Sequence, residues 1–232
     1  MNRSSKITVI GDSVSKGVIL EDNKIKTLET NAVHIVGEYL NTKIENNSMF
    51  GQTLQRVYTR GLVEKYLNAI DENERNVLAL SLGGNDCDFN WQDVAKDPKK
   101  EHSSKTSPME FLRYLDEITQ KLLKKRVKVL FTTLFPVDSN RYFNNVISKL
   151  CEGEKVLDFL NGDLSNIHRH QEVFNEIICY NANKYGCKII DIRTLFLLSV
   201  NYLSFVSSDG IHPNNAGQNK IAQQIIQNID QY

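Results

Sequence analysis

The chain has 232 residues, 41% of them hydrophobic, and we expect one globular domain over residues 1–232 that buries a sizeable core. Its 28 Lys and Arg residues balance its 28 Asp and Glu residues, so no net positive charge attracts a polyanion and nucleic acid is not an expected partner. No apolar run reaches the ~20 residues that span a bilayer or forms the core of a secretory signal, so we expect a cytoplasmic protein without a transmembrane segment.

Short, nearly continuous runs of apolar and β-branched residues predict strands that are buried on both faces of a parallel sheet. These runs cover residues 6–10, 76–82, 127–134 and 187–192, and a weaker strand is expected around residues 43–47. The strands are separated by segments in which apolar residues recur at helical spacing, so each such segment is expected to be an amphipathic crossover helix.

Three such helical faces stand out, and two of the helix boundaries carry their own signals. Ser107-Pro108-Met109-Glu110 combines a capping residue, a proline at the first helical position and a capping-box glutamate, while Gly186 is an expected C-terminal cap. The faces consist of Leu54, Val57, Tyr58, Leu62 and Tyr66, then of Phe111, Leu115, Ile118 and Leu122, and then of Phe174, Ile177, Ile178, Asn181 and Tyr185.

Strands and helices alternate along the whole chain, which predicts a three-layer α/β/α sandwich with a mostly parallel five-stranded sheet, of the flavodoxin-like kind. Residues 92–108 and 138–170 interrupt the alternation, and both stretches follow strand ends. Because ligands bind beyond the carboxyl ends of the strands in such sheets, we expect both stretches to rim a site. Residues 138–170 have two interpretations, an amphipathic lid over an acyl pocket or an extra helix packed on the core.

The first two segments with reactive residues follow the first strand and the weak strand. Ser13, in Gly-Asp-Ser-Val-Ser-Lys-Gly at residues 11–17, precedes a short helix whose N-terminus favours developing negative charge, although a serine there is commonly just a helix cap. Gly51 lies just before a helix, where its backbone N–H can approach a ligand, although a turn glycine is the commoner case. Neither segment is decisive alone.

The other two segments are residues 83–86 and residues 209–213. The side-chain amide of Asn85, in Gly-Gly-Asn-Asp, offers donors that stabilise an oxyanion, although these residue types also favour a simple turn. Asp209 stands three residues before His212, where a carboxylate can hold the imidazole in one tautomer and leave its other nitrogen as a base. A structural Asp-His turn is the alternative.

Taken together, the four segments resemble the four sequence blocks of the SGNH hydrolase family, also called GDSL-type esterases and lipases. The matching residues are Gly-Asp-Ser-Val-Ser-x-Gly at 11–17, Asn-x-x-x-Gly at 47–51, Gly-x-Asn-Asp at 83–86 and Asp-x-x-His-Pro-Asn at 209–214, in the family order. Val14 stands where the family usually has leucine. The resemblance implies the fold of that family, Ser13 as nucleophile, Asp209 and His212 as the other triad members, and Ser13, Gly51 and Asn85 as oxyanion-hole donors.

The resemblance further implies a serine esterase that hydrolyses a small-molecule ester through an acyl-enzyme on Ser13, with no metal or other cofactor. We expect an acetylated carbohydrate or another small acyl ester as substrate. The alternatives are a lysophospholipase or thioesterase acting on longer acyl chains, and a non-catalytic α/β module that binds a small ligand. The other four histidines (His34, His102, His168 and His170) lack partners at metal-ligand spacing and are expected to be solvated or core residues.

Overall fold

A computed structural model describes residues 5–21, 24–71 and 73–232. Its centre is a sheet of five parallel strands in the order β4-β1-β5-β6-β7. The strands are β1 (Ser5–Gly11), β4 (Glu45–Asn46), β5 (Arg75–Ser81), β6 (Lys128–Thr132) and β7 (Lys188–Ile190). Each coincides with a predicted strand, so the expected parallel five-stranded sheet is confirmed.

The order of the strands decides where a site can form. The chain runs from β1 outward to β4 and then returns past β1 to add β5, β6 and β7 on its other side. In parallel α/β sheets, ligands bind in the crevice where the strand order reverses, beyond the carboxyl ends of the strands. The segments that follow β1, β4 and β5 therefore meet at this crevice, and they contain three of the four sequence blocks.

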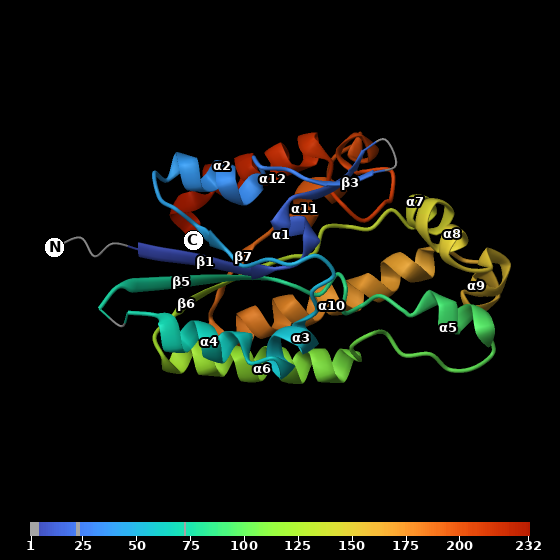
Figure 1. The fold of residues 1–232 in the computed structure, drawn as a ribbon, viewed down its shortest axis with the longest axis horizontal. Helices are drawn as coiled ribbons and strands as arrows, with labels where there is room; N and C mark the ends of the chain where they lie inside the picture. The colour runs from blue at the N-terminus through green and yellow to red at the C-terminus, as the bar shows by residue number, and fades with distance from the viewer. Residues whose placement is uncertain (1–4, 22–23, 72) are drawn as a thin grey trace.

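Helices cover both faces of the sheet and complete the three-layer sandwich (Figure 1). On one face lie α3 (Leu54–Thr59), α4 (Leu62–Ala69), α6 (Pro108–Lys124) and α10 (Ser165–Tyr185). On the other face lie α2 (Ala32–Tyr39), α11 (Arg193–Leu197) and α12 (Asn215–Gln227). The capping box at Ser107 and the left-handed C-cap at Gly186 are both confirmed.

The prediction of one continuous amphipathic helix from Leu54 to Tyr66 is wrong. The chain breaks between α3 and α4, where Gly61 has φ +61°, a backbone conformation that glycine adopts without strain. The apolar residues of both pieces still pack on the same side of the sheet. The apolar residues therefore keep their helical spacing across the break, so the spacing alone does not indicate where α3 ends and α4 begins.

Further elements fall on segments for which no element was predicted. They include the antiparallel hairpin of β2 (Val18–Glu21) and β3 (Lys24–Thr27) and two 3-10 helices, Tyr202–Phe205 and Ile229–Gln231. The short helix expected at Ser13 is present as α1 (Ser13–Lys16). None of the described helices has the length and apolar character needed to cross a bilayer.

The two irregular stretches form a cap beyond the carboxyl ends of the strands (Figure 1). The cap consists of α5 (Trp91–Lys96), α7 (Ser139–Tyr142), a π-helix (Phe143–Ile147), α8 (Ser148–Leu150), α9 (Gly153–Phe159) and the first turns of α10. Its apolar side chains, among them Trp91, Phe143 and Val156, make a cluster separate from the cores on the two sheet faces. The cap is thus a packed unit that sits over the crevice.

Candidate active site

Ser13 is the first residue of α1, directly after β1, and its side chain does not cap the helix. Asp12 is the capping residue instead, because its Oδ1 accepts a hydrogen bond of 2.9 Å from the backbone N–H of Val14. The simple interpretation of Ser13 as a helix cap is therefore wrong. The Ser13 hydroxyl is free for another partner, and the side chain is only 6% exposed.

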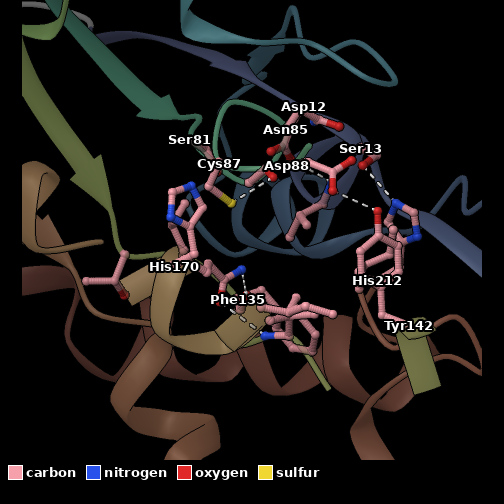
Figure 2. Close-up of a pocket in the computed structure, with 18 of the residues that line it drawn as sticks. Asp12, Ser13, Ser81, Asn85, Cys87, Asp88, Phe135, Tyr142, His170 and His212 are labelled. Carbon is pink, nitrogen blue, oxygen red and sulfur yellow. Dashed lines mark hydrogen bonds between the residues drawn. The ribbon is translucent and has the colours of Figure 1, made fainter. Parts of the chain in front are cut away.

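That partner is His212, which lies 199 residues further along the chain. Its Nε2 is 2.8 Å from Ser13 Oγ (Figure 2). On the other side of the ring, Nδ1 is 2.7 Å from Asp209 Oδ2. A carboxylate only accepts hydrogen bonds, so Nδ1 carries the proton and Nε2 accepts from the serine hydroxyl. The serine, histidine and aspartate side chains thus form one continuous hydrogen-bonded line, from which His212 can take up the hydroxyl proton.

Asp209 is fixed by its own loop as well as by the imidazole. Burial alone raises the pKa of this carboxyl, but the hydrogen bond from His212 and the backbone N–H groups of Ile211 and His212 hold the pKa below its ordinary value. Asp209 is therefore ionised at neutral pH, and its carboxylate holds the His212 ring through Nδ1.

The loop that carries Asp209 and His212 is held against the cap. Gly210 has φ +78°, and a Cβ there would lie 2.6 Å from the carbonyl oxygen of Asp138. The backbone N–H of Asp138 in turn donates to the Gly210 carbonyl at 2.8 Å, and the Arg141 guanidinium donates to the Val206 carbonyl at 2.8 Å. Only glycine fits this approach, so the cap and the histidine loop are positioned together.

The two other predicted oxyanion donors come from neighbouring turns. Asn85 Nδ2 donates to the Gln52 carbonyl at 3.1 Å, which uses one of its two N–H bonds. Gly51, with φ +66°, stands between Gln52 and Phe50, whose ring lies against the His212 ring. Asn85 thus lines the same cavity as Ser13 and His212, and Gly51 follows the residue whose ring faces His212, while the donor roles of both stay predictions.

Asp86 ties these two turns together, a role that the sequence analysis missed. Its buried carboxylate accepts from the Leu54 backbone N–H at 2.8 Å, at the start of α3, and from the Thr106 hydroxyl at 2.6 Å. Burial nevertheless raises the pKa of Asp86. The acidic residue after Asn85 therefore fixes the α3 turn on the β5 turn.

Asp12 is a second buried carboxyl at the site. Burial raises its pKa to about 6, while the Val14 N–H and the nearby His212 lower it and the charge of Asp86 raises it. Because folding raises the pKa of Asp12 from 3.8 to about 6, ionisation of this carboxyl lowers the free energy of unfolding of the protein by about 3 kcal/mol. The loss is absent below pH 3.8, grows as the pH rises and is complete above pH 6.

Replacing Asp12 with Asn is expected to stabilise the protein at high pH, because the amide oxygen still caps α1 while the buried charge is gone. The free energy of unfolding of Asp12→Asn minus that of the wild type should be larger at pH 8 than at pH 3.5, by about 3 kcal/mol. Urea titrations at both pH values measure this difference. The exposed Asp230→Asn variant is the control, and a difference for Asp12→Asn that is independent of pH would contradict the expectation.

A cavity of about 90 Å³ opens beside Ser13 and runs beneath the cap. Its floor includes Ser81, Thr132 and Ile192 at the carboxyl ends of β5, β6 and β7, while Tyr142 and Ile167 belong to its cap-side wall. Residues of the 138–170 stretch thus border the site, as predicted. The stretch forms several packed helices whose apolar cluster is separate from the cores of the sheet, and its role as a lid over an acyl pocket stays a prediction.

A hydrogen-bonded group makes the cap-side wall rigid. Asp88 Oδ1 accepts from Trp91 Nε1 at 2.8 Å and from the Tyr142 hydroxyl at 2.9 Å, and Asp88 Oδ2 pairs with Lys105 at 2.7 Å. Each of these partners comes from a different segment, and Tyr142 is buried. The size of the cavity is therefore set by side chains that are themselves fixed.

Cys87 and His170 lie across the cavity from Ser13 and His212 (Figure 2). The Cys87 thiol donates to the Gly84 carbonyl at 3.2 Å, and burial raises its pKa well above the usual value, so it is not an activated nucleophile. Burial also lowers the pKa of His170, which is therefore neutral at pH 7. Among the described residues, no group of three or more His, Cys, Asp or Glu side chains is placed to hold a metal ion.

A model of the GDSL-like Lipase/Acylhydrolase family matches residues 9–220, and no curated protein matches. A lipase/acylhydrolase from Enterococcus faecalis is similar in structure, with 16% identity and a TM-score of 0.64 over 98% of this chain and 96% of that chain. A catalytic mutant of an acetylxylan esterase from Geobacillus stearothermophilus has 17% identity and a TM-score of 0.66 over 99% and 95%.

A third structure, of a psychrotrophic esterase from Pseudoalteromonas sp. inhibited by monoethylphosphonate, has 14% identity and a TM-score of 0.58 over 98% of each chain. At these identities the structures establish the common fold, and the family model establishes the family. The chain therefore belongs to the GDSL-like lipase/acylhydrolase family and is a hydrolase that acts on ester bonds.

Proposed function

We propose that the protein hydrolyses carboxylic esters through a covalent acyl-enzyme on Ser13. The observation that carries this proposal is the line of hydrogen bonds from Ser13 Oγ to His212 Nε2 at 2.8 Å and from His212 Nδ1 to Asp209 at 2.7 Å. Ser13 Oγ attacks the carbonyl carbon as its proton passes to Nε2, and Asp209 stabilises the imidazolium. The tetrahedral intermediate then expels the alcohol, which takes the proton from Nε2. Water, deprotonated by the same nitrogen, releases the acid.

The oxyanion of the tetrahedral intermediate is held by three donors in this proposal. They are the backbone N–H groups of Ser13 and Gly51 and the second N–H of the Asn85 amide. Neither backbone group donates a hydrogen bond to any acceptor among the described residues. Donors that are fixed before the reaction stabilise the developing charge without reorganisation, and the bond from Asn85 to Gln52 provides this fixation.

The acyl group of the substrate is short, as in an acetylated carbohydrate or another small acyl ester. The cavity beside Ser13 has a volume of about 90 Å³. The cap helices close over this space, which favours an acyl group of a few carbon atoms over a long chain. The fixed Trp91, Tyr142 and Asp88 side chains oppose expansion of the cavity beneath the cap.

A series of p-nitrophenyl esters from acetate to decanoate tests this function. The kcat/KM is expected to be highest for acyl chains of two to four carbons, and Ser13→Ala is expected to hydrolyse none of the esters above the rate in buffer. A maximum at eight carbons or more would contradict the short-acyl proposal and favour a lipase or thioesterase. Hydrolysis absent from both proteins would contradict the esterase proposal itself.

A further inference from the structure

The two halves of an ester lie on different sides of the proposed site. His212 Nε2 gives its proton to the departing alcohol oxygen, so the alcohol half lies on the His212 side of the carbonyl carbon. The acyl half points into the cavity beneath the cap, which is lined from Ser13 across to Tyr142 and Ile167. The side chains beside His212 that face solvent are therefore placed to contact the alcohol.

Phe50 is the aromatic side chain at that place. Its ring and the His212 ring are stacked, with centroids 6.2 Å apart and an angle of 26° between the planes. The Phe50 side chain is 55% exposed and belongs to none of the three apolar clusters, and the adjacent Met49 is 48% exposed. The Phe50 ring thus presents a solvent-exposed aromatic face next to His212.

The turn that carries Phe50 is fixed at both ends. Met49 N donates to the Gly11 carbonyl at 3.1 Å, and the Gln52 side chain donates to the same carbonyl at 3.2 Å. The Arg56 guanidinium donates to the Gly51 carbonyl at 3.2 Å. The aromatic ring is therefore presented from a backbone that is tied to β1, and a ligand that stacks on it gains contact without ordering a loose loop.

We propose that Phe50 is the platform on which the alcohol half of the substrate stacks, and that this half is a sugar ring. A pyranose ring has an apolar face of C–H groups, which can cover the aromatic face, and hydroxyl groups on its rim, which stay in water. An aliphatic chain that lies on the half-exposed Phe50 ring would keep its other side, which is also apolar, in contact with water. The inference rests on the proposed esterase function and extends it from the acyl group to the alcohol.

Two acetate esters that share the acyl group test this platform. For each variant, kcat/KM is measured with an acetylated methyl pyranoside and with ethyl acetate, and the ratio of the two values is the readout. Because both substrates form the same acetyl-enzyme, the ratio reports contacts to the alcohol in the acylation step. Phe50→Ala is expected to lower this ratio by about three- to tenfold, mainly through KM for the pyranoside, and Phe50→Tyr to restore it.

Tyr39→Ala is the control, since Tyr39 is an exposed aromatic residue, 59% exposed, on α2 away from the site. Its ratio should equal that of the wild type. A ratio unchanged by Phe50→Ala would overturn the platform. If kcat/KM fell equally with both esters, so that the ratio stayed the same, Phe50 would only steady His212. A wild-type protein that hydrolyses neither ester would overturn the esterase function, a result distinct from an active enzyme with an unchanged ratio.

Discussion

His212→Ala is expected to lower kcat for ester hydrolysis by roughly 10⁴- to 10⁶-fold. Among the described side chains, the His212 imidazole is the one that hydrogen bonds to Ser13 Oγ, at 2.8 Å. Without it, the hydroxyl has no base to accept its proton, and the alcohol has no acid to protonate it as it leaves. Stopped assays with p-nitrophenyl acetate at high enzyme concentration measure the residual rate.

Loss of activity must be separated from loss of folding, because His212→Ala leaves the buried Asp209 carboxylate without its main partner. Asp209→Asn avoids this unpaired charge and is expected to lower kcat by about 10⁴-fold through the wrong imidazole tautomer. His34→Ala, at an exposed histidine of α2, should be fully active. A folded His212→Ala protein within tenfold of the wild-type rate would contradict the proposed mechanism.

Asn85→Ala has the second-largest expected effect, a fall in kcat of about 10²- to 10³-fold, which is typical for the loss of one oxyanion donor. The variant keeps Ser13, His212 and Asp209 intact and removes an amide that is tied to Gln52 at 3.1 Å. The loss should appear in kcat more than in KM, since an oxyanion forms only in the transition state and intermediates.

Asn76→Ala is the matched control for this variant. Asn76 Nδ2 also donates to a backbone carbonyl, that of Asp71 at 2.8 Å, but it lies at the opposite end of β5 from Asn85. Both variants lose a side-chain to backbone hydrogen bond, and thermal unfolding should show comparable or greater destabilisation for Asn76→Ala. Equal kcat values for Asn85→Ala and the wild type would remove Asn85 from the proposed oxyanion hole.

The sequence predicts the sheet well, because strands buried on both faces need continuous apolar runs. The runs at residues 76–82 and 127–134 fall on β5 and β6 for this reason. Helix ends are predictable where a residue has a defined bonding role, as at Ser107 and Gly186. The break at Gly61 is not, because both pieces keep their apolar faces towards the same core.

At the site, the residue types and their order predict which side chains meet, while the contacts among them need the fold. Ser13 is the residue that the sequence suggests as the cap of α1, and only the geometry assigns the cap to Asp12. Phe50 carries no signal in the sequence, since one apolar residue beside a glycine is ordinary until His212 lies next to it. The roles of the triad and oxyanion residues, the single domain and the cytoplasmic location stay predictions.

The residue that carries the acyl group can be identified by covalent labelling. Diethyl p-nitrophenyl phosphate transfers a phosphoryl group to activated serines and leaves a stable adduct that mass spectrometry can locate after proteolysis. We predict one adduct per chain, on Ser13, with activity lost in proportion to labelling and no labelling of His212→Ala. An adduct on Ser15 or another residue with Ser13 unmodified, or full activity after complete labelling of Ser13, would contradict the account.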